Sequence, residues 1–246
     1  MWGFLHGPRS SGQSEQYDFR FDLPAQCAEA LGAGEVDLGL VPCAELDRLG
    51  MGFLPGLGIA CDGPVRSILL VSKKPLRQIA TLAADSSSRT SVALTRILLA
   101  ERYGCVPTIT QQSPKLEDML AEHDAALIIG DPALRIDPPK LPFETLDLGA
   151  EWVAWSGLPM VFAVWAGRAE ALRPSVARTF QDSYEWGRGH TEEIVARAVA
   201  ERGFPADLAG EYVRRNIVYE LGPRHLAGLE LFRRKVRDLA GMRAVL

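Results

Sequence analysis

The sequence predicts an α/β protein shaped as a two-lobed clamp with a helical C-terminal segment. Strand-like and helix-like runs alternate up to about residue 166, a pattern typical of βαβ units and largely parallel sheets. The segment 74–158 carries its own βαβαβ pattern between two connecting strands, and a clamp of this kind holds its ligand in the cleft. We therefore expect residues 1–73 plus 159–246 to form lobe 1, and residues 74–158 to form an inserted lobe 2.

The first lobe has strand signals of two kinds. Alternating apolar residues predict a half-buried strand over 17–23, after which Pro24 opens a helix over 25–32. Mainly apolar residues predict a buried strand over 36–41, and further strand signal lies at 59–62 and 65–72.

The second lobe and the C-terminal segment follow with clear punctuation by Gly and Pro. In the inserted lobe we predict strand 79–84, helix 88–103, strand 106–111, helix 116–121 and strand 125–129. A tight turn at Gly130-Asp131-Pro132 ends the last of these strands. A further strand over 160–165 precedes four helices, which we predict at 174–188, 191–202, 205–220 and 223–240.

Composition excludes several classes of function. A net charge of −4 over 246 residues lacks the basic face that nucleic-acid binding needs. Neither the four cysteines nor the four histidines cluster at metal-ligand spacing, so no metal site is expected and the cysteines are read as reduced thiols of a cytoplasmic protein. No nucleotide-binding glycine motif and no apolar run of membrane-spanning length occurs. We expect a small-molecule ligand and no cofactor, and leave monomer and homodimer open.

The strongest functional signal is a polar cluster between a predicted strand and a predicted helix. It consists of Ser86, Ser87, Ser88, Arg89, Thr90 and Ser91. We predict Ser87 or Ser88 as the helix N-cap, so that free backbone amides and the helix dipole favour an anion here, in our reading a carboxylate. Capping alone is the alternative, but five hydroxyls and an arginine exceed what a cap requires. Ser87 and Ser88 are the catalytic candidates, and the other four are candidates for substrate binding.

Six further residues are candidates for substrate binding because they lie at predicted strand ends or at the hinge. They are Pro42, Cys43, Arg66, Ser67, Gly130 and Asp131. Simple strand packing is the alternative for Cys43 and Ser67, and turn capping is the alternative for Asp131.

Several of these segments, taken in order, resemble the chorismate dehydratase family of the futalosine route to menaquinone. The matching segments cover 34–42, 62–67, 85–91, 125–134, 151–152 and 157–166. The resemblance implies the fold of type-2 periplasmic binding proteins, used for catalysis inside the cell. It also implies a hydro-lyase reaction in which chorismate loses water to give 3-[(1-carboxyvinyl)oxy]benzoate, without a redox or metal cofactor.

One part of the family pattern is missing here. Family members begin with a strand and a Ser-Tyr-Leu-Asn-Thr-like loop, whereas this chain starts at the helix-like piece Met1-Trp2-Gly3-Phe4-Leu5. The resemblance implies that this loop supplies a Ser and an Asn near the substrate. We therefore expect reduced stability and weak or no activity.

Two alternative functions stay open at this point. The sister enzyme 1,4-dihydroxy-6-naphthoate synthase shares the fold, but its chemistry wants a histidine base in the cleft, and the turn at 130–132 has none. A non-catalytic module that binds a carboxylate solute would retain chorismate unchanged. No protein base stands out, so a substrate carboxylate is our candidate for the proton acceptor.

Overall fold

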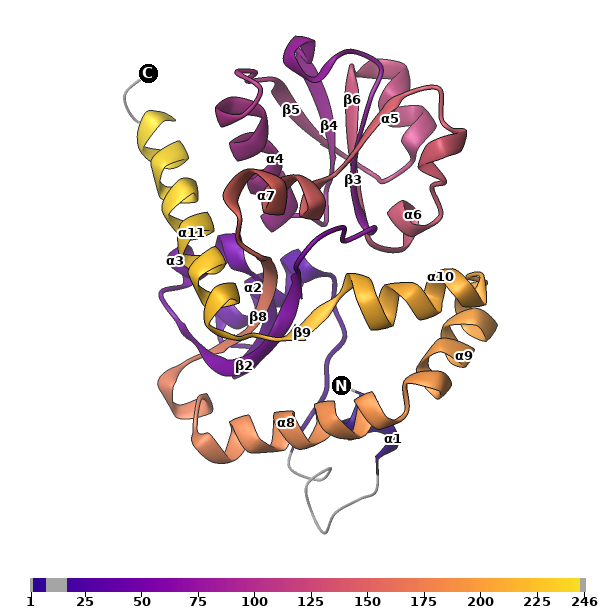
Figure 1. Cartoon of the computed structure of the whole chain (residues 1–246). Coiled ribbons are helices and arrows are strands. Elements are labelled where there is room, and N and C mark those ends of the chain that lie inside the picture. The colour runs from indigo at the N-terminus through magenta and orange to yellow at the C-terminus, as the bar shows by residue number, and fades with distance from the viewer. Residues whose placement is uncertain (1, 8–16, 244–246) are drawn as a thin grey trace.

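The computed structural model describes residues 2–7 and 17–243, which fold around two β-sheets (Figure 1). The four-stranded sheet has the order β1-β8-β2-β9 and the five-stranded sheet the order β5-β4-β6-β3-β7. The strands of the first are β1 (Leu38–Pro42), β2 (Gly52–Cys61), β8 (Met160–Gly167) and β9 (Val218–Glu220). Those of the second are β3 (Ile68–Ser72), β4 (Thr81–Asp85), β5 (Thr108–Gln112), β6 (Ala125–Ile129) and β7 (Glu144–Asp147).

Helices surround both sheets and form a long arm at the C-terminal end. The α-helices that precede β8 in the chain are α1 (Trp2–His6), α2 (Pro24–Ala33), α3 (Leu46–Leu49), α4 (Thr90–Glu101), α5 (Leu116–Glu122), α6 (Gly130–Leu134) and α7 (Leu148–Ser156). The later ones are α8 (Pro174–Gly189), α9 (Thr191–Arg202), α10 (Ala206–Glu211), a π-helical turn (Tyr212–Asn216) and α11 (Pro223–Arg243). In Figure 1 the arm α8–α10 curves below the four-stranded sheet, and α10 ends up beneath α6.

The expectation of largely parallel sheets is wrong for most strand pairs. All recorded pairs of the four-stranded sheet are antiparallel, and in the five-stranded sheet only β4 pairs in parallel, with β5 and with β6. The reason is that the chain crosses between the sheets twice. Strand β8 therefore returns antiparallel between β1 and β2, and β3 lies antiparallel to β6.

Three segments differ from their predictions. Residues 17–23 are extended but join no strand, and Phe19 packs instead on Phe4, with ring centroids 5.3 Å apart. The helix predicted over 205–220 ends in the π-helical turn, since Val218–Glu220 pairs with β2 as strand β9. Residues 130–134 form the short helix α6 rather than a simple turn.

The lobe boundaries remain a prediction. The two sheets nevertheless group the chain in a similar way, because the second sheet takes its strands from residues 68–147 and the first from the flanking segments. Strand β3 belongs to the five-stranded sheet, although we expected residues 65–72 in lobe 1.

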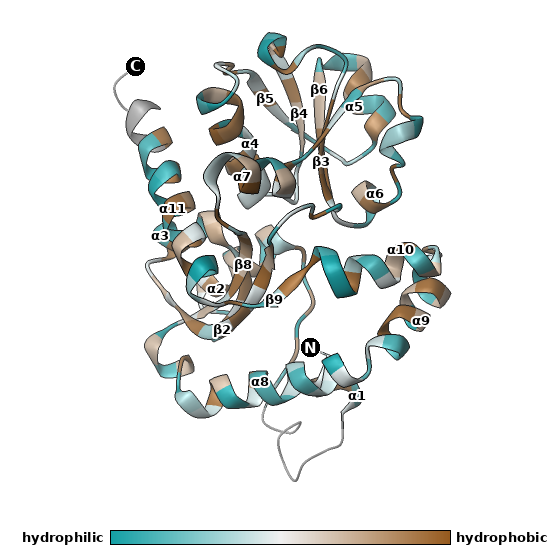
Figure 2. Cartoon of the chain, in the orientation of Figure 1, coloured by the Kyte–Doolittle hydropathy of each residue, from teal (hydrophilic) through white to brown (hydrophobic). Residues whose placement is uncertain are grey.

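The apolar core runs through both sheets and between them. Figure 2 shows apolar residues gathered on the strands of the two sheets. Strand β3 is buried along its whole length, as expected for a strand covered on both faces. Trp152 of α7 is fully buried, donates from Nε1 to the Pro159 carbonyl at 3.3 Å and packs edge-on against Phe232 of α11. These contacts join the C-terminal helix to the connection that leads into β8.

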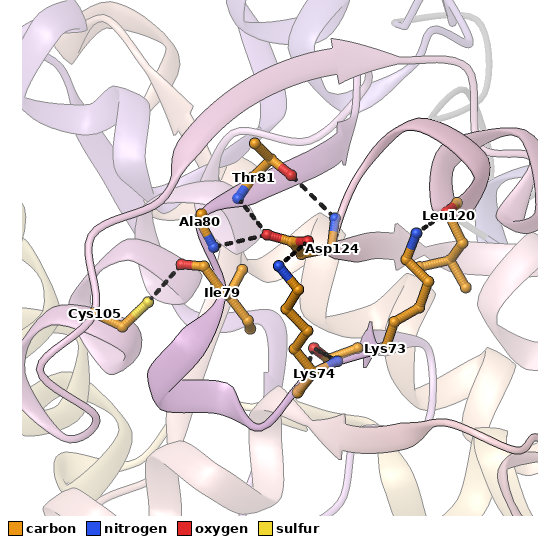
Figure 3. A network of polar contacts seen from close by, with 9 residues as sticks. Lys73, Lys74, Ile79, Ala80, Thr81, Cys105, Leu120 and Asp124 are labelled. Atoms are coloured by element: carbon orange, nitrogen blue, oxygen red, sulfur yellow. Dashed lines mark hydrogen bonds and ion pairs between the residues drawn. The ribbon is translucent and has the colours of Figure 1, made fainter.

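A polar network fixes one end of the five-stranded sheet (Figure 3). The Asp124 carboxylate accepts from Lys74 Nζ at 2.7 Å and from the backbone amides of Ala80 and Thr81 at 2.9 and 3.1 Å. In return, Thr81 Oγ1 accepts from the Asp124 amide at 3.0 Å. The network ties the start of β6 to the start of β4 and so sets their parallel register.

No helix among residues 2–7 and 17–243 is both long enough and apolar enough to cross a membrane.

Candidate functional site

Three of the predicted site segments lie where the strands of the five-stranded sheet end, at the carboxyl ends of β4 and β6; this end of the sheet is called the sheet edge below. Strands β4 and β6 are parallel neighbours, so the segments after them, 86–91 and 130–131, leave the sheet at the same edge. Ile68 pairs with Ile129, which brings Arg66 and Ser67, just before β3, to this edge as well. The topology thus brings together residues from three separate stretches of sequence.

The N-terminus of α4 touches the other sheet through Thr90. The Thr90 hydroxyl accepts from the Ala44 amide at 3.2 Å and donates to the Phe162 carbonyl at 3.0 Å. Ala44 directly follows Pro42 and Cys43, so these two candidates lie at the end of β1 facing α4. This edge is therefore where the two sheets meet, and Thr90 links them through its two hydrogen bonds.

The serine turn is organised by Asp85 rather than by a helix cap. Asp85 is buried, and its Oδ1 accepts from the Ser87 amide at 2.9 Å and from the Ser87 hydroxyl at 2.7 Å. The N-cap of α4 is Arg89, with no side chain bonded to the first turn, so the prediction of Ser87 or Ser88 as N-cap is wrong. Among residues 2–7 and 17–243, no side chain caps the positive end of this helix dipole.

The burial and the unsatisfied hydroxyl of Ser88 indicate a ligand-binding position. Its side chain is only 2% exposed, yet its hydroxyl has no hydrogen-bond partner among the described residues. A buried polar group without a partner is costly and uncommon in folded proteins. Ser88 lies two residues before the first helical residue of α4, beside the uncapped amides. A ligand oxygen at this point would satisfy both.

Arg89 brings positive charge to the same turn. Its Nη2 lies 3.6 Å from Glu29 Oε1 and its Nε lies 3.8 Å from Glu45 Oε1. Both distances exceed those of tight charge-assisted hydrogen bonds. The two glutamates therefore offset the charge of the guanidinium without using its hydrogen-bond donors fully. Ser86 is exposed and Ser91 is buried.

Ser67 and Gly130 contact one another beside this turn. The Gly130 amide donates to the Ser67 carbonyl at 2.8 Å. Gly130 has φ +65°, a left-handed conformation that favours glycine. Ser67 is 4% exposed, and its Oγ accepts from the Tyr212 hydroxyl at 3.1 Å.

Arg66 and Asp131 already have partners within the protein. The Arg66 guanidinium donates to the carbonyls of Ala133, at 3.2 Å, and Ile136, which holds the segment after β6. Its backbone takes φ +65°, and its amide donates to Asp147 at 2.6 Å. Asp131 pairs with Arg202 of α9 at 2.5 Å. Binding of a substrate carboxylate by either side chain stays a prediction, and each would first have to release a partner.

Two residues of this region escaped sequence reasoning. Asp147 caps α7 by accepting from the amides of Gly149 and Ala150, both at 3.0 Å, and also accepts from the backbone amides of Val65 and Arg66. An Asp before an apolar segment is the signal that could have located this cap. Tyr212 lies 145 residues from its partner Ser67, and no local signal connects them.

A cavity of about 600 Å³ lies away from these residues. It sits between the four-stranded sheet and the arm α8–α9, and its walls include Leu40, Trp165, Phe180 and Tyr184. None of the predicted site residues lines it. We base the site on the sheet edge, because the polar groups that suit an anion converge there.

The four cysteines are free thiols, three of them buried, and burial raises the pKa of the Cys43 thiol well above its usual range. A buried thiol of this kind is a weak nucleophile. Within the described part of the chain, His, Cys, Asp and Glu side chains form no group of three that could hold a metal ion.

Comparisons with known proteins agree with this architecture. A chorismate dehydratase from Thermus thermophilus is 33% identical over 230 residues, covering 85% of this chain and 83% of that protein. Among solved structures, a protein from Archaeoglobus fulgidus matches with a TM-score of 0.68 at 18% identity, covering 92% and 86% of the two chains. The alkanesulfonate-binding protein SsuA from Xanthomonas axonopodis pv. citri matches with a TM-score of 0.58 at 14% identity, covering 88% and 81%.

These similarities confirm the resemblance predicted from the motifs, and the structural ones confirm the fold of periplasmic binding proteins. The model of a family described as menaquinone biosynthesis matches residues 1–238. The chain belongs to this menaquinone biosynthesis family.

Proposed function

We propose that this chain is a chorismate dehydratase, a hydro-lyase that converts chorismate into 3-[(1-carboxyvinyl)oxy]benzoate and water. Family membership and the name of the Thermus thermophilus relative support the reaction. The observation that carries the site is the buried Ser88 hydroxyl, which has no hydrogen-bond partner in the described part of the chain and lies next to the N-terminus of α4.

The site suits a dianionic substrate. Chorismate carries two carboxylates, and the uncapped amides of α4 stabilise an anion by about 0.3–1 kcal/mol, or up to about 2 kcal/mol when partly buried. Ser88 donates a hydrogen bond to one carboxylate, and Arg89 adds positive charge beside it. Ser67 and the segment at Gly130 lie at the same sheet edge and hold the other end of the substrate.

The reaction needs orientation and exclusion of water more than a strong base. A ring C–H bond and the allylic C–O bond break, the electron pair of the C–H bond completes the aromatic ring, and the hydroxyl leaves as water. A carboxylate of the substrate accepts the ring proton and a proton is then delivered from it to the leaving hydroxyl, which departs as water, while serine hydroxyls stabilise the charge that develops on the leaving oxygen. Atoms balance without an oxidant or reductant, so we infer no redox cofactor. Four free cysteines agree with a cytoplasmic location.

The test is incubation of the purified chain with chorismate, followed by mass spectrometry for the loss of one water. Ser88→Ala removes the unpartnered hydroxyl, and Ser175→Ala, at an exposed position in the first turn of α8, is the matched control. We expect kcat/KM to fall about 10- to 100-fold in Ser88→Ala, as for the loss of a hydrogen bond to a charged group. The control should match the wild type.

Two results would contradict the proposal. Equal turnover by Ser88→Ala and Ser175→Ala would remove the site from the N-terminus of α4. Tight binding of chorismate that stays unchanged would instead identify a solute-binding protein.

A further inference from the structure

The π-helical turn Tyr212–Asn216 docks on the segment that crosses between the two sheets. Tyr212 donates from its hydroxyl to Ser67 Oγ at 3.1 Å, and Asn216 donates from Nδ2 to the Pro64 carbonyl at 3.2 Å. The Ile217 amide bonds to the Tyr212 carbonyl at 3.2 Å, the five-residue spacing of a π-turn. Single π-turns are rare and are frequently found at functional sites.

Ser67 is held so that its own proton stays available. Its Oγ accepts from Tyr212, and among the described residues no group accepts the Ser67 hydroxyl proton. A hydroxyl can donate one hydrogen bond and accept two, so the donor capacity of Ser67 is unused. Accepting a hydrogen bond also polarises a hydroxyl and makes it a better donor. Ser67 is 4% exposed, so bulk water satisfies it poorly.

The surroundings keep Tyr212 in the protonated form. Burial raises the pKa of Tyr212; the hydrogen bond with Ser67 acts in the opposite direction and the nearby Asp131 carboxylate adds to the increase, so the net shift is upward. The ring is half-buried and packs with Phe204 and Leu134, which lie in the arm and in α6 respectively. The Tyr212 phenol is therefore protonated at neutral pH. It belongs to the turn that follows α10, and it donates to Ser67, the residue before β3 of the five-stranded sheet.

We propose that Tyr212 is a positioning residue of the substrate site, which fixes the Ser67 hydroxyl so that Ser67 donates to a carboxylate oxygen of the substrate. Gly130 completes this subsite, because its amide fixes the Ser67 backbone. The inference deepens the proposed function and rests on it. It assigns the two ends of the substrate to different segments, one to Ser88 and α4, the other to Ser67.

A double-mutant cycle with Tyr212→Phe and Ser67→Ala tests the coupling. Tyr212→Phe keeps the ring and its packing, and Tyr219→Phe, a neighbouring tyrosine in β9, is the matched control. The dissociation constant for chorismate is measured by calorimetry, kcat and KM by turnover, and folding by thermal denaturation. We expect each single variant to weaken binding and raise KM about five- to tenfold with a smaller change in kcat. The double variant should be no weaker than Ser67→Ala, because Tyr212 acts through Ser67.

Two results would overturn the inference. Wild-type affinity for chorismate in Tyr212→Phe, with or without a lowered melting temperature, or independent multiplication of the effects of the two substitutions would make Tyr212 purely structural. If one of these results is found while the wild-type chain still converts chorismate, the inference fails but the dehydratase proposal stands. Absence of both binding and turnover in the wild type would overturn the two together.

Discussion

Replacing Thr90 by Val is the sharpest perturbation of the contact between the sheets. Valine preserves the shape of the side chain but removes the hydroxyl that serves the Ala44 amide and the Phe162 carbonyl. Phe162 is skipped in the register between β8 and β2, where pairing passes from Ala163 directly to Val161. Thr90 therefore supplies a hydrogen bond at an irregularity of the ladder.

The cost follows from the two groups left behind. A buried backbone group without a partner costs about 1–3 kcal/mol, and Ala44 is only half-buried, so water serves its amide in part. We expect Thr90→Val to lose about 2–3 kcal/mol of unfolding free energy, equivalent to a fall in Tm of about 4–12 °C for a chain of this size.

Thr95→Val is the matched control in the same helix. Thr95 is fully buried and donates only to the Ser91 carbonyl, at 2.8 Å, which already accepts the regular α-helical bond. Its loss should cost less than about 1 kcal/mol. Urea denaturation followed by circular dichroism compares the two variants, and hydrogen exchange at the Ala44 amide reports the broken contact directly. Equal stability of the two variants would refute the reasoning. Unchanged stability with lost chorismate binding would make Thr90 a substrate ligand rather than a link between the sheets.

Two further predictions concern ionisation. The Lys74 ammonium, followed by the Ala80 and Thr81 amides, holds the pKa of Asp124 well below its usual range, so its contribution to stability is present above the unfolded pKa of about 4 and is lost as pH falls toward the lower folded value. Asp124→Asn should therefore lower the urea midpoint at pH 7 and narrow the difference from the wild type at pH 3, and an equal difference at both values would contradict this. Burial raises the pKa of the Cys61 thiol to about 12, whereas Cys27 is half-exposed. A maleimide should label Cys27 first in the native protein, as read by peptide mass spectrometry, and equally fast labelling of Cys61 would show that the native fold opens there.

Local patterns predicted the elements well where one signal dominated. The strand over 125–129 matches β6 because a fully apolar run ends at Gly130. Strand β9 was missed because three residues inside a helical pattern carry too little signal, and only β2 makes them a strand. The extended segment 17–23 alternates like a strand but has no partner in the ladder.

The site shows the same division between local and distant information. The polar turn at 86–91 was visible from its composition, and the topology placed it at an edge between sheets. The N-cap prediction failed because Asp85, just outside the cluster of hydroxyls, engages Ser87. The commitments of Arg66 and the contact of Tyr212 with Ser67 arise from tertiary packing, which no spacing in the sequence encodes.

The central place of β8 in the four-stranded sheet has a consequence for how the chain folds during synthesis. Strands β1 and β2 both pair with β8, which is made only after all strands of the five-stranded sheet. Pairing β8 with the distant strands β1 and β2 has a larger entropic cost than pairing strands that are closer in sequence. We therefore expect the five-stranded sheet to assemble first on the ribosome. Until residue 167 emerges, β1 and β2 wait with open edges, and this interval is when the nascent chain is most exposed to aggregation and most dependent on chaperones.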